Sequence, residues 1–204
     1  MNNHLVTQNT KRSTYSMRST LLALGLSLGL SLGLSLPSFA ATALKTDQAK
    51  SHITIVFKQM NVPVDANFKK FNAQITYDSA HPEAAKAGAT IDINSFDLGD
   101  PDYNKEVMKK EWFNAAKFPQ ATFVSTAIKP LAADKIDVTG KLTIKGKTTD
   151  VQFPLTVKKQ GNGHVFEGNL PIKRLTYNIG EGDWKDTSMV ADEVVIKFHI
   201  TTTP

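Results

Sequence analysis

The feature that most constrains the fold is a two-residue alternation of apolar and more polar side chains along much of the chain. Within residues 51–58, Ile53, Ile55 and Phe57 occupy every second position. Successive side chains of a strand point to opposite faces, so this period predicts a strand with one buried face. Similar patterns predict further strands at residues 66–77, 91–93, 121–125, 136–144, 151–157, 164–172 and 193–201.

Short turn signals separate several of these strands. Gly161-Asn162-Gly163 is the strongest of them, and Lys145-Gly146-Lys147 is another. About eight closely spaced strands joined by hairpins are typical of an antiparallel sandwich or barrel, and alternation alone does not choose between the two. Pro154 and Pro171 lie inside strand patterns, where a missing N–H predicts a bulge.

The period changes between residues 100 and 116. Asp100 is a favourable N-cap, and Pro101 suits the first helical position. The apolar residues that follow have helical spacing, which predicts a short amphipathic helix between strands. These residues are Tyr103, Val107, Met108 and Trp112.

Aromatic and methionine side chains are concentrated around this segment. They are Phe96, Tyr103, Met108, Trp112, Phe113, Phe118 and Phe123. Such side chains commonly form the core beneath a helix. Together they are also the usual lining of an apolar ligand cavity, and both interpretations stay open at this point.

The first forty residues predict an export signal. Lys11, Arg12 and Arg18 precede an apolar run, residues 21–36, and the segment ends in a small-x-small pattern at Ala40. The run is shorter than a membrane-spanning helix requires. We therefore expect residues 1–40 to be cleaved and residues 41–204 to form one domain outside the cytoplasm, in the periplasm.

Removal of this signal changes the charge of the protein. Three of the 24 Lys and Arg residues and no Asp or Glu lie in residues 1–40, so the remainder carries 21 basic against 19 acidic residues and a formal charge of +2 in place of +5. The remaining lysines are scattered singly. We therefore expect no nucleic-acid partner.

Catalytic and metal motifs are not found in the sequence. It contains no cysteine and no G-x-S-x-G nucleophile motif, and its histidines are widely spaced, with His52 and His199 expected to face solvent. The loop carboxylates do not have EF-hand spacing, and helix capping or turn formation accounts for Asp100 and Asp183. We expect no catalytic residue, no metal ligand and no enzyme activity.

The chain resembles the YceI-like family of exported lipid-binding proteins. The resemblance lies in residues 51–60, Phe68-Lys69-Lys70-Phe71, Glu111-Trp112-Phe113-Asn114, Lys117-Phe118-Pro119, residues 121–125, residues 138–146, Phe166-Glu167-Gly168, Arg174 and residues 177–180. It implies an all-β fold, an elongated eight-stranded antiparallel lipocalin-like β-barrel, with the short amphipathic helix between strands. It also implies that the barrel holds a polyisoprenoid, isoprenoid quinone or fatty-acyl chain for transport or storage.

This resemblance sets the expected site and partners. We expect no cofactor apart from a bound isoprenoid or fatty-acyl ligand, and an apolar long-chain small molecule as partner. A monomer or a homodimer, and transient contact with a membrane, are both compatible with this role. The alternatives are an enzyme acting on a lipid-like substrate in the same cavity and a ligand-free structural or partner-binding β-domain. The expected ligand-binding residues are Ile53, Ile55, Phe57, Ile93, Met108, Trp112, Phe113, Phe123, Leu142, Ile144, Phe153 and Phe166.

Overall fold

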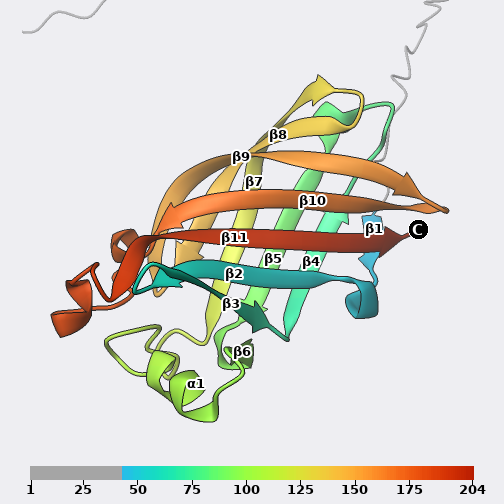
Figure 1. The fold of residues 1–204 in the computed structure, drawn as a ribbon. Helices are drawn as coiled ribbons and strands as arrows, with labels where there is room; N and C mark the ends of the chain where they lie inside the picture. The colour runs from blue at the N-terminus through green and yellow to red at the C-terminus, as the bar shows by residue number, and fades with distance from the viewer. Residues whose placement is uncertain (1–42) are drawn as a thin grey trace, which may run out of the picture. The chain divides into compact units, whose positions relative to one another are not determined.

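The computed structural model describes residues 43–204, and the predicted signal lies outside them. This part of the chain forms eleven strands and one α-helix (Figure 1). The strands are β1 (Ala43–Thr46), β2 (His52–Gln59), β3 (Val62–Phe68), β4 (Phe71–Thr76), β5 (Lys86–Asp92), β6 (Phe96–Asp97), β7 (Gln120–Ala132), β8 (Lys135–Ile144), β9 (Lys147–Gln160), β10 (Gly163–Lys173) and β11 (Val190–Thr203). The helix is α1 (Pro101–Val107), and short 3₁₀ helices occupy Gln48–Lys50, Pro82–Ala84, Ile93–Ser95, Arg174–Tyr177 and Gly182–Lys185.

Eight of the strands close into an antiparallel barrel. The order β1-β4-β5-β7-β8-β9-β10-β11 returns to β1 because Lys45 and Thr46 pair with Thr203 and Thr202. The same edge of β11 pairs with β2 over its earlier residues, and β3 and β6 continue from β2. The predicted eight-stranded antiparallel barrel with one short helix is confirmed.

Tight turns join neighbouring strands of the barrel. Lys145 and Gly146, between β8 and β9, both have positive φ, at 49° and 74°. Met60 and Asn61, between β2 and β3, also both have positive φ, at 47° and 64°. Two consecutive residues with positive φ match the twist of a two-residue hairpin. The turn predicted at Lys145-Gly146 is confirmed, whereas the turn at Met60-Asn61 was not predicted.

The strand predicted at residues 66–77 is wrong as a single element. The chain bends at Lys69-Lys70, which separates β3 from β4. Neither lysine is a turn-forming residue, so local sequence gave no signal for this break. The strand predicted at residues 91–93 also ends early, because Asp92 caps the 3₁₀ helix that contains Ile93 by accepting a hydrogen bond from Asn94 N.

The predicted helix begins where expected but is shorter. Asp100 is the N-cap, and its side chain accepts from the backbone N–H groups of Asp102 and Tyr103 at 2.8 and 3.2 Å. Regular α-helix ends at Val107, and turns carry the chain onward to β7.

The predicted bulges at Pro154 and Pro171 are wrong. Each proline faces outward and keeps regular register with one neighbour, Asp137 and Val195 respectively. The pairing between β9 and β10 stops at Leu155 and Gly168, so both prolines lie beyond it and their missing N–H groups interrupt no ladder on that side. The register shifts in the described strands lie instead between β7 and β8 and between β11 and β2.

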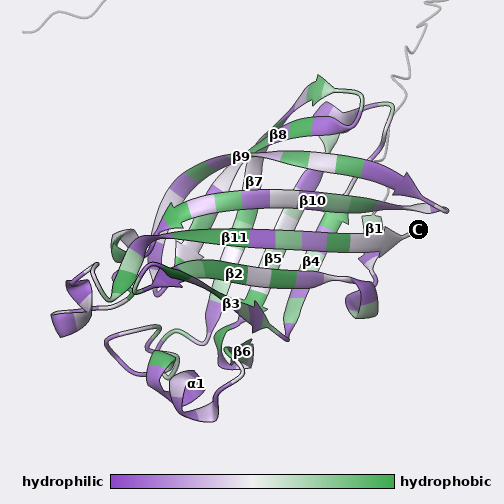
Figure 2. Cartoon of the chain, viewed as in Figure 1, coloured by the Kyte–Doolittle hydropathy of each residue, from purple (hydrophilic) through white to green (hydrophobic). Residues whose placement is uncertain are grey.

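The barrel interior is the hydrophobic core. Along β8, Ile136, Val138, Leu142 and Ile144 are buried while the residues between them are more exposed, except at Gly140. Hydropathy accordingly alternates along β8 and β11 in Figure 2. Burial of each such large apolar side chain stabilises the fold by about 1.5–3 kcal/mol, so this inward face specifies the register.

The helices in the described part of the chain are all too short or too polar to cross a membrane.

Candidate ligand-binding cavity

The barrel encloses an apolar cavity of about 290 Å³. This volume is many times what one water molecule needs, whereas a normally packed core leaves few voids larger than a water. Its lining comes from every barrel strand except β1, together with β2, β3, β6, α1 and the segments that follow α1 and β10. The barrel interior therefore contains a cavity lined by side chains and is not completely filled by them.

Eleven of the twelve residues predicted to bind ligand line this cavity. They are Ile53, Ile55, Phe57, Ile93, Trp112, Phe113, Phe123, Leu142, Ile144, Phe153 and Phe166. Their binding role stays a prediction, since lining a cavity is not contact with a ligand.

Met108 is the exception among the twelve. It packs against the core but does not line the cavity. The helical spacing used to place it does not hold, because α1 ends at Val107 and Met108 is the C-cap. Tyr103, Glu106 and Val107 of α1 line the cavity instead.

Aromatic rings that line the cavity form three groups. Phe68, Phe96 and Phe113 contact one another near α1, with ring centroids 5.4–6.2 Å apart. Phe153 lies between Phe123 and Phe198 at 5.6 and 5.5 Å. Tyr77 and Phe166 meet edge to face at 5.5 Å. Rings in these offset and edge-on geometries form a firm apolar wall.

Arg174 is the buried charge of the cavity lining. It is only 2% exposed and stands at the start of the 3₁₀ helix after β10. All five of its N–H groups donate to backbone carbonyls, so the guanidinium ties the segment after β10 to the beginning of β11. The acceptors are the carbonyls of Ile179, Gly180, Trp184, Val190 and Ala191, at 2.7–3.4 Å.

Two tryptophans flank this guanidinium. The Arg174 Cζ atom lies 5.6 Å from the Trp112 ring, and the Trp112 and Trp184 rings are 5.2 Å apart. All three residues line the cavity. Trp112 Nε1 is buried and has no hydrogen-bond partner among the described residues. Burial lowers the pKa of Arg174, with Asp192 opposing that shift.

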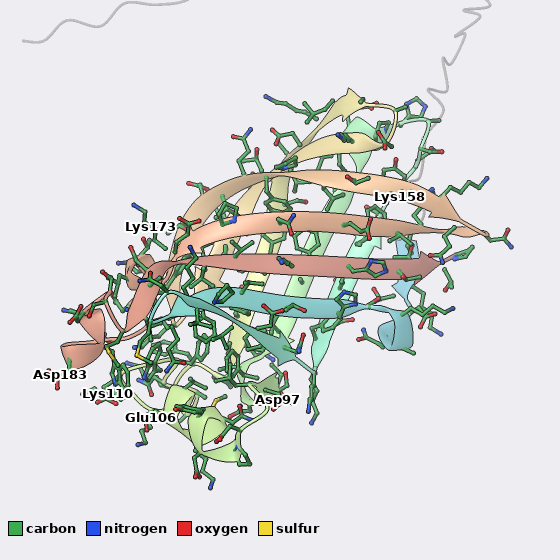
Figure 3. The ribbon with its side chains drawn as sticks, viewed as in Figure 1. Asp97, Glu106, Lys110, Lys158, Lys173 and Asp183 are labelled. Atoms are coloured by element: carbon green, nitrogen blue, oxygen red, sulfur yellow. The ribbon has the colours of Figure 1, made fainter. Side chains whose placement is uncertain are left out.

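A second cation fastens the same end of the barrel. Lys145 Nζ is paired with Glu181 at 2.8 Å and also donates to the carbonyls of Lys110 and Asn178. The backbone N–H groups of Gly180 and Glu181 donate to the Glu111 carbonyl. These bonds hold the segment after α1 against the segment after β10. In Figure 3, Glu106, Lys110, Lys173 and Asp183 lie at this end, while Lys158 on β9 lies toward the opposite end.

The carboxylates near this end have structural partners. Lys145 lowers the pKa of Glu181. Lys69, then Asn104 and the Gly99 N–H, hold the pKa of Asp97 well below its usual range. A carboxylate acting as an acid near neutral pH needs the opposite, a raised pKa.

The predicted histidine positions are on the outer face of the barrel. His52 is exposed, and His199 stacks on it at 4.9 Å while its Nδ1 lies 2.9 Å from Glu167 Oε1. Within residues 43–204, no group of three or more His, Asp or Glu side chains is placed to hold a metal ion.

Sequence reasoning missed Arg174 as the centre of a site. It follows the exposed Lys173 and begins a 3₁₀ helix, so its local sequence context is that of a surface residue. Only the return of β11 and of residues 179–184 around it makes it buried. The one signal present was its place in the family-like segment from Arg174 to Gly180.

An antiparallel barrel closed around an apolar cavity, with one buried charge in its lining, defines the class of β-barrels that have internal space for a small molecule. Within that class, the chain belongs to the YceI-like family, since the model of the YceI-like domain matches residues 44–202.

Individual relatives agree with this assignment. Protein YceI of Salmonella newport is 32% identical over 156 residues, which cover 70% of this chain and 81% of that protein. The crystal structure of Burkholderia cenocepacia BcnA is similar at 55% identity and a TM-score of 0.76, covering 78% of this chain and 100% of that chain. A polyisoprenoid binding domain from Saccharophagus degradans, 18% identical with a TM-score of 0.64 over 80% of this chain and 99% of that chain, shares the fold.

Proposed function

We propose that the protein binds a long apolar chain inside its barrel, a polyisoprenoid, an isoprenoid quinone or a fatty-acyl lipid, and carries or stores it. The observation that carries this proposal is the apolar cavity itself. The name of the Saccharophagus degradans domain, which describes polyisoprenoid binding, is consistent with it.

The free energy for such binding comes from the hydrophobic effect. Transfer of apolar surface out of water yields about 25 cal/mol per Å². An extended chain with several hundred square ångströms of surface would therefore supply on the order of 10 kcal/mol before the entropic costs of binding are subtracted. The smooth apolar wall suits chains of different chemistry, because it offers few directional contacts.

The place of action is proposed to be the periplasm. The support is the predicted cleavable signal in residues 1–40. An apolar chain crosses an aqueous compartment slowly unless a protein shields it from water. A carrier released between two membranes would meet that need, with transient membrane contact during loading and unloading.

Binding can be tested with a substitution that fills the cavity. Ala73 on β4 is buried and lines the cavity, whereas its neighbour Gln74 is exposed on the outer face. The delipidated protein would be titrated with a long-chain fatty acid and with a long-chain prenol. Emission of Trp112 and Trp184 reports binding, since both lie against the cavity.

The expected result separates the two faces of β4. Ala73→Phe should weaken binding about tenfold or more, because the ring occupies ligand volume. Gln74→Phe, the matched control, should bind as the wild type does. If the wild type binds neither ligand, or Ala73→Phe binds as well as Gln74→Phe, the proposal is wrong.

A further inference from the structure

The charges that line the cavity are not equivalent. Lys86 is exposed to solvent, and the Glu106 carboxylate accepts a hydrogen bond from Lys109 Nζ as part of an ion pair. Arg174, by contrast, is buried. The electrostatic field inside the cavity therefore comes mainly from the Arg174 guanidinium.

No carboxylate forms an ion pair with this guanidinium among the described residues. Its five donors all meet carbonyl oxygens, and the nearby Asp192 side chain accepts from Leu175 N instead. The other buried cation at this end, Lys145, has Glu181 as its counter-ion. Carbonyl dipoles solvate Arg174, and Asp192 favours its charged form without forming an ion pair with it, so this buried charge is offset only in part.

Trp112 provides a second unused polar group beside it. Its side chain is about nine-tenths buried, and its indole N–H is a donor only, with no acceptor among the described residues. Its ring lies against the guanidinium. A lone buried donor is costly to leave unpaired, so an oxygen acceptor supplied by a ligand would improve this site.

We propose that the Arg174–Trp112 end of the cavity takes an anionic oxygen head group, a phosphate or a carboxylate, while the apolar remainder of the barrel holds its chain. This inference rests on the proposed function and specifies the class of ligand. Arg174 acts through its charge, because its donors are already used. Trp112 supplies the hydrogen bond.

The same charge disfavours cationic ligands. Two unit charges interact strongly where water is excluded, and the interaction changes sign with the head group. A chain ending in a phosphate or a carboxylate gains from this field, a neutral alcohol gains little, and an ammonium is repelled. The head group thus sets selectivity where the apolar wall does not.

The test uses ligands that differ only in their ends. Hexadecyl phosphate, hexadecanoic acid, hexadecanol and hexadecylamine would be titrated into the delipidated wild-type protein below their micelle concentrations. We expect the phosphate and the acid to bind about ten- to a hundredfold more tightly than the amine, with the alcohol between them. Comparison of the affinities for hexadecyl phosphate and hexadecanoic acid shows whether the site prefers a phosphate or a carboxylate.

Salt concentration separates Arg174 from the surface lysines. At about 0.5 M salt an exposed charge is strongly screened, whereas a buried one is not. The preference for anions should persist in high salt. If the preference for anions disappears in high salt, it comes from the surface lysines, and the inference is wrong.

Substitutions assign the preference to this site. Trp112→Phe keeps an aromatic ring and removes the N–H, so it should weaken binding of the phosphate about tenfold and leave the amine unchanged. Lys173→Gln, which removes an exposed positive charge next to Arg174, is the control and should change neither. If all four ligands bind the wild type equally, this inference is wrong and the proposed function stands. If none binds, both are wrong.

Discussion

Replacement of Arg174 by methionine is the most informative single perturbation of the fold. The substitution keeps an unbranched side chain and removes the guanidinium. Five backbone carbonyls, between residues 179 and 191, would lose a donor at once. Since Arg174 is 2% exposed, water reaches these carbonyls only if the segment opens.

The cost follows from the number of acceptors left unpaired. A buried acceptor without a donor costs about 1–3 kcal/mol, and partial access of water reduces this figure. A hydrogen bond from a charged donor contributes about 1.5–3 kcal/mol, and the five losses do not add because the segment relaxes. We therefore expect Arg174→Met to lower the free energy of unfolding by about 3–5 kcal/mol, a large part of the total of about 5–15 kcal/mol for a typical domain.

Urea unfolding, followed by tryptophan fluorescence, measures this change. Lys173→Met is the matched control, because Lys173 is exposed and adjacent, and it should change stability by less than about 0.5 kcal/mol. Arg174→Lys should be intermediate, since an ammonium keeps the charge with fewer donors. A loss below about 1 kcal/mol in Arg174→Met would refute the idea that this guanidinium fastens the end of the barrel.

Two further predictions concern the opposite end of the strands. In Gly163→Ala a Cβ atom would lie 1.8 Å from the Thr202 carbonyl oxygen, so we expect the free energy of unfolding, measured with urea, to fall by about 3 kcal/mol. Gly88→Ala, where the nearest atom is 3.7 Å away, is the control and should be nearly neutral. Equal stabilities of the two variants would contradict the close contact at Gly163. Burial, and then Lys159, hold the pKa of His164 below its ordinary 6.5, so the unfolded chain takes up the proton first and stability should fall as pH drops below about 6.5. His164→Gln should make the free energy of unfolding less dependent on pH between about 7.5 and 5.5, and an unchanged dependence would show that other groups cause it.

The strands that sequence predicted well are those whose pairing is local. The segment 136–144 alternates cleanly and is followed by the turn signal at Lys145-Gly146-Lys147, and it matches β8 closely. In long hairpin strands of this kind, both the two-residue alternation and the turn residues that end the strand are present in the local sequence. The resemblance then resolved the choice between sandwich and barrel, which alternation had left open.

The parts that sequence missed depend on distant partners. β1 has only four residues and exists because β4 and the end of β11 flank it, so no local pattern marks the strand that closes the barrel. The split between β3 and β4 falls at Lys69-Lys70, which has no turn residue.

The same limit applied to the site. The predicted residues on strands line the cavity because inward-facing positions follow from alternation, whereas Met108, placed by helical spacing, does not line it. Arg174 was not predictable, since its burial depends on residues 179–191 folding back over it. A single sequence records the side chain but not the carbonyls that surround it.

The central claim is that the barrel holds a long apolar chain. The most direct measurement is extraction of the natively purified protein into organic solvent, followed by mass spectrometry of the extract. We expect a polyisoprenoid, isoprenoid quinone or fatty-acyl lipid at near one molecule per barrel, and much less from Ala73→Phe. An extract without lipid, from a protein that also binds no added chain, would contradict it.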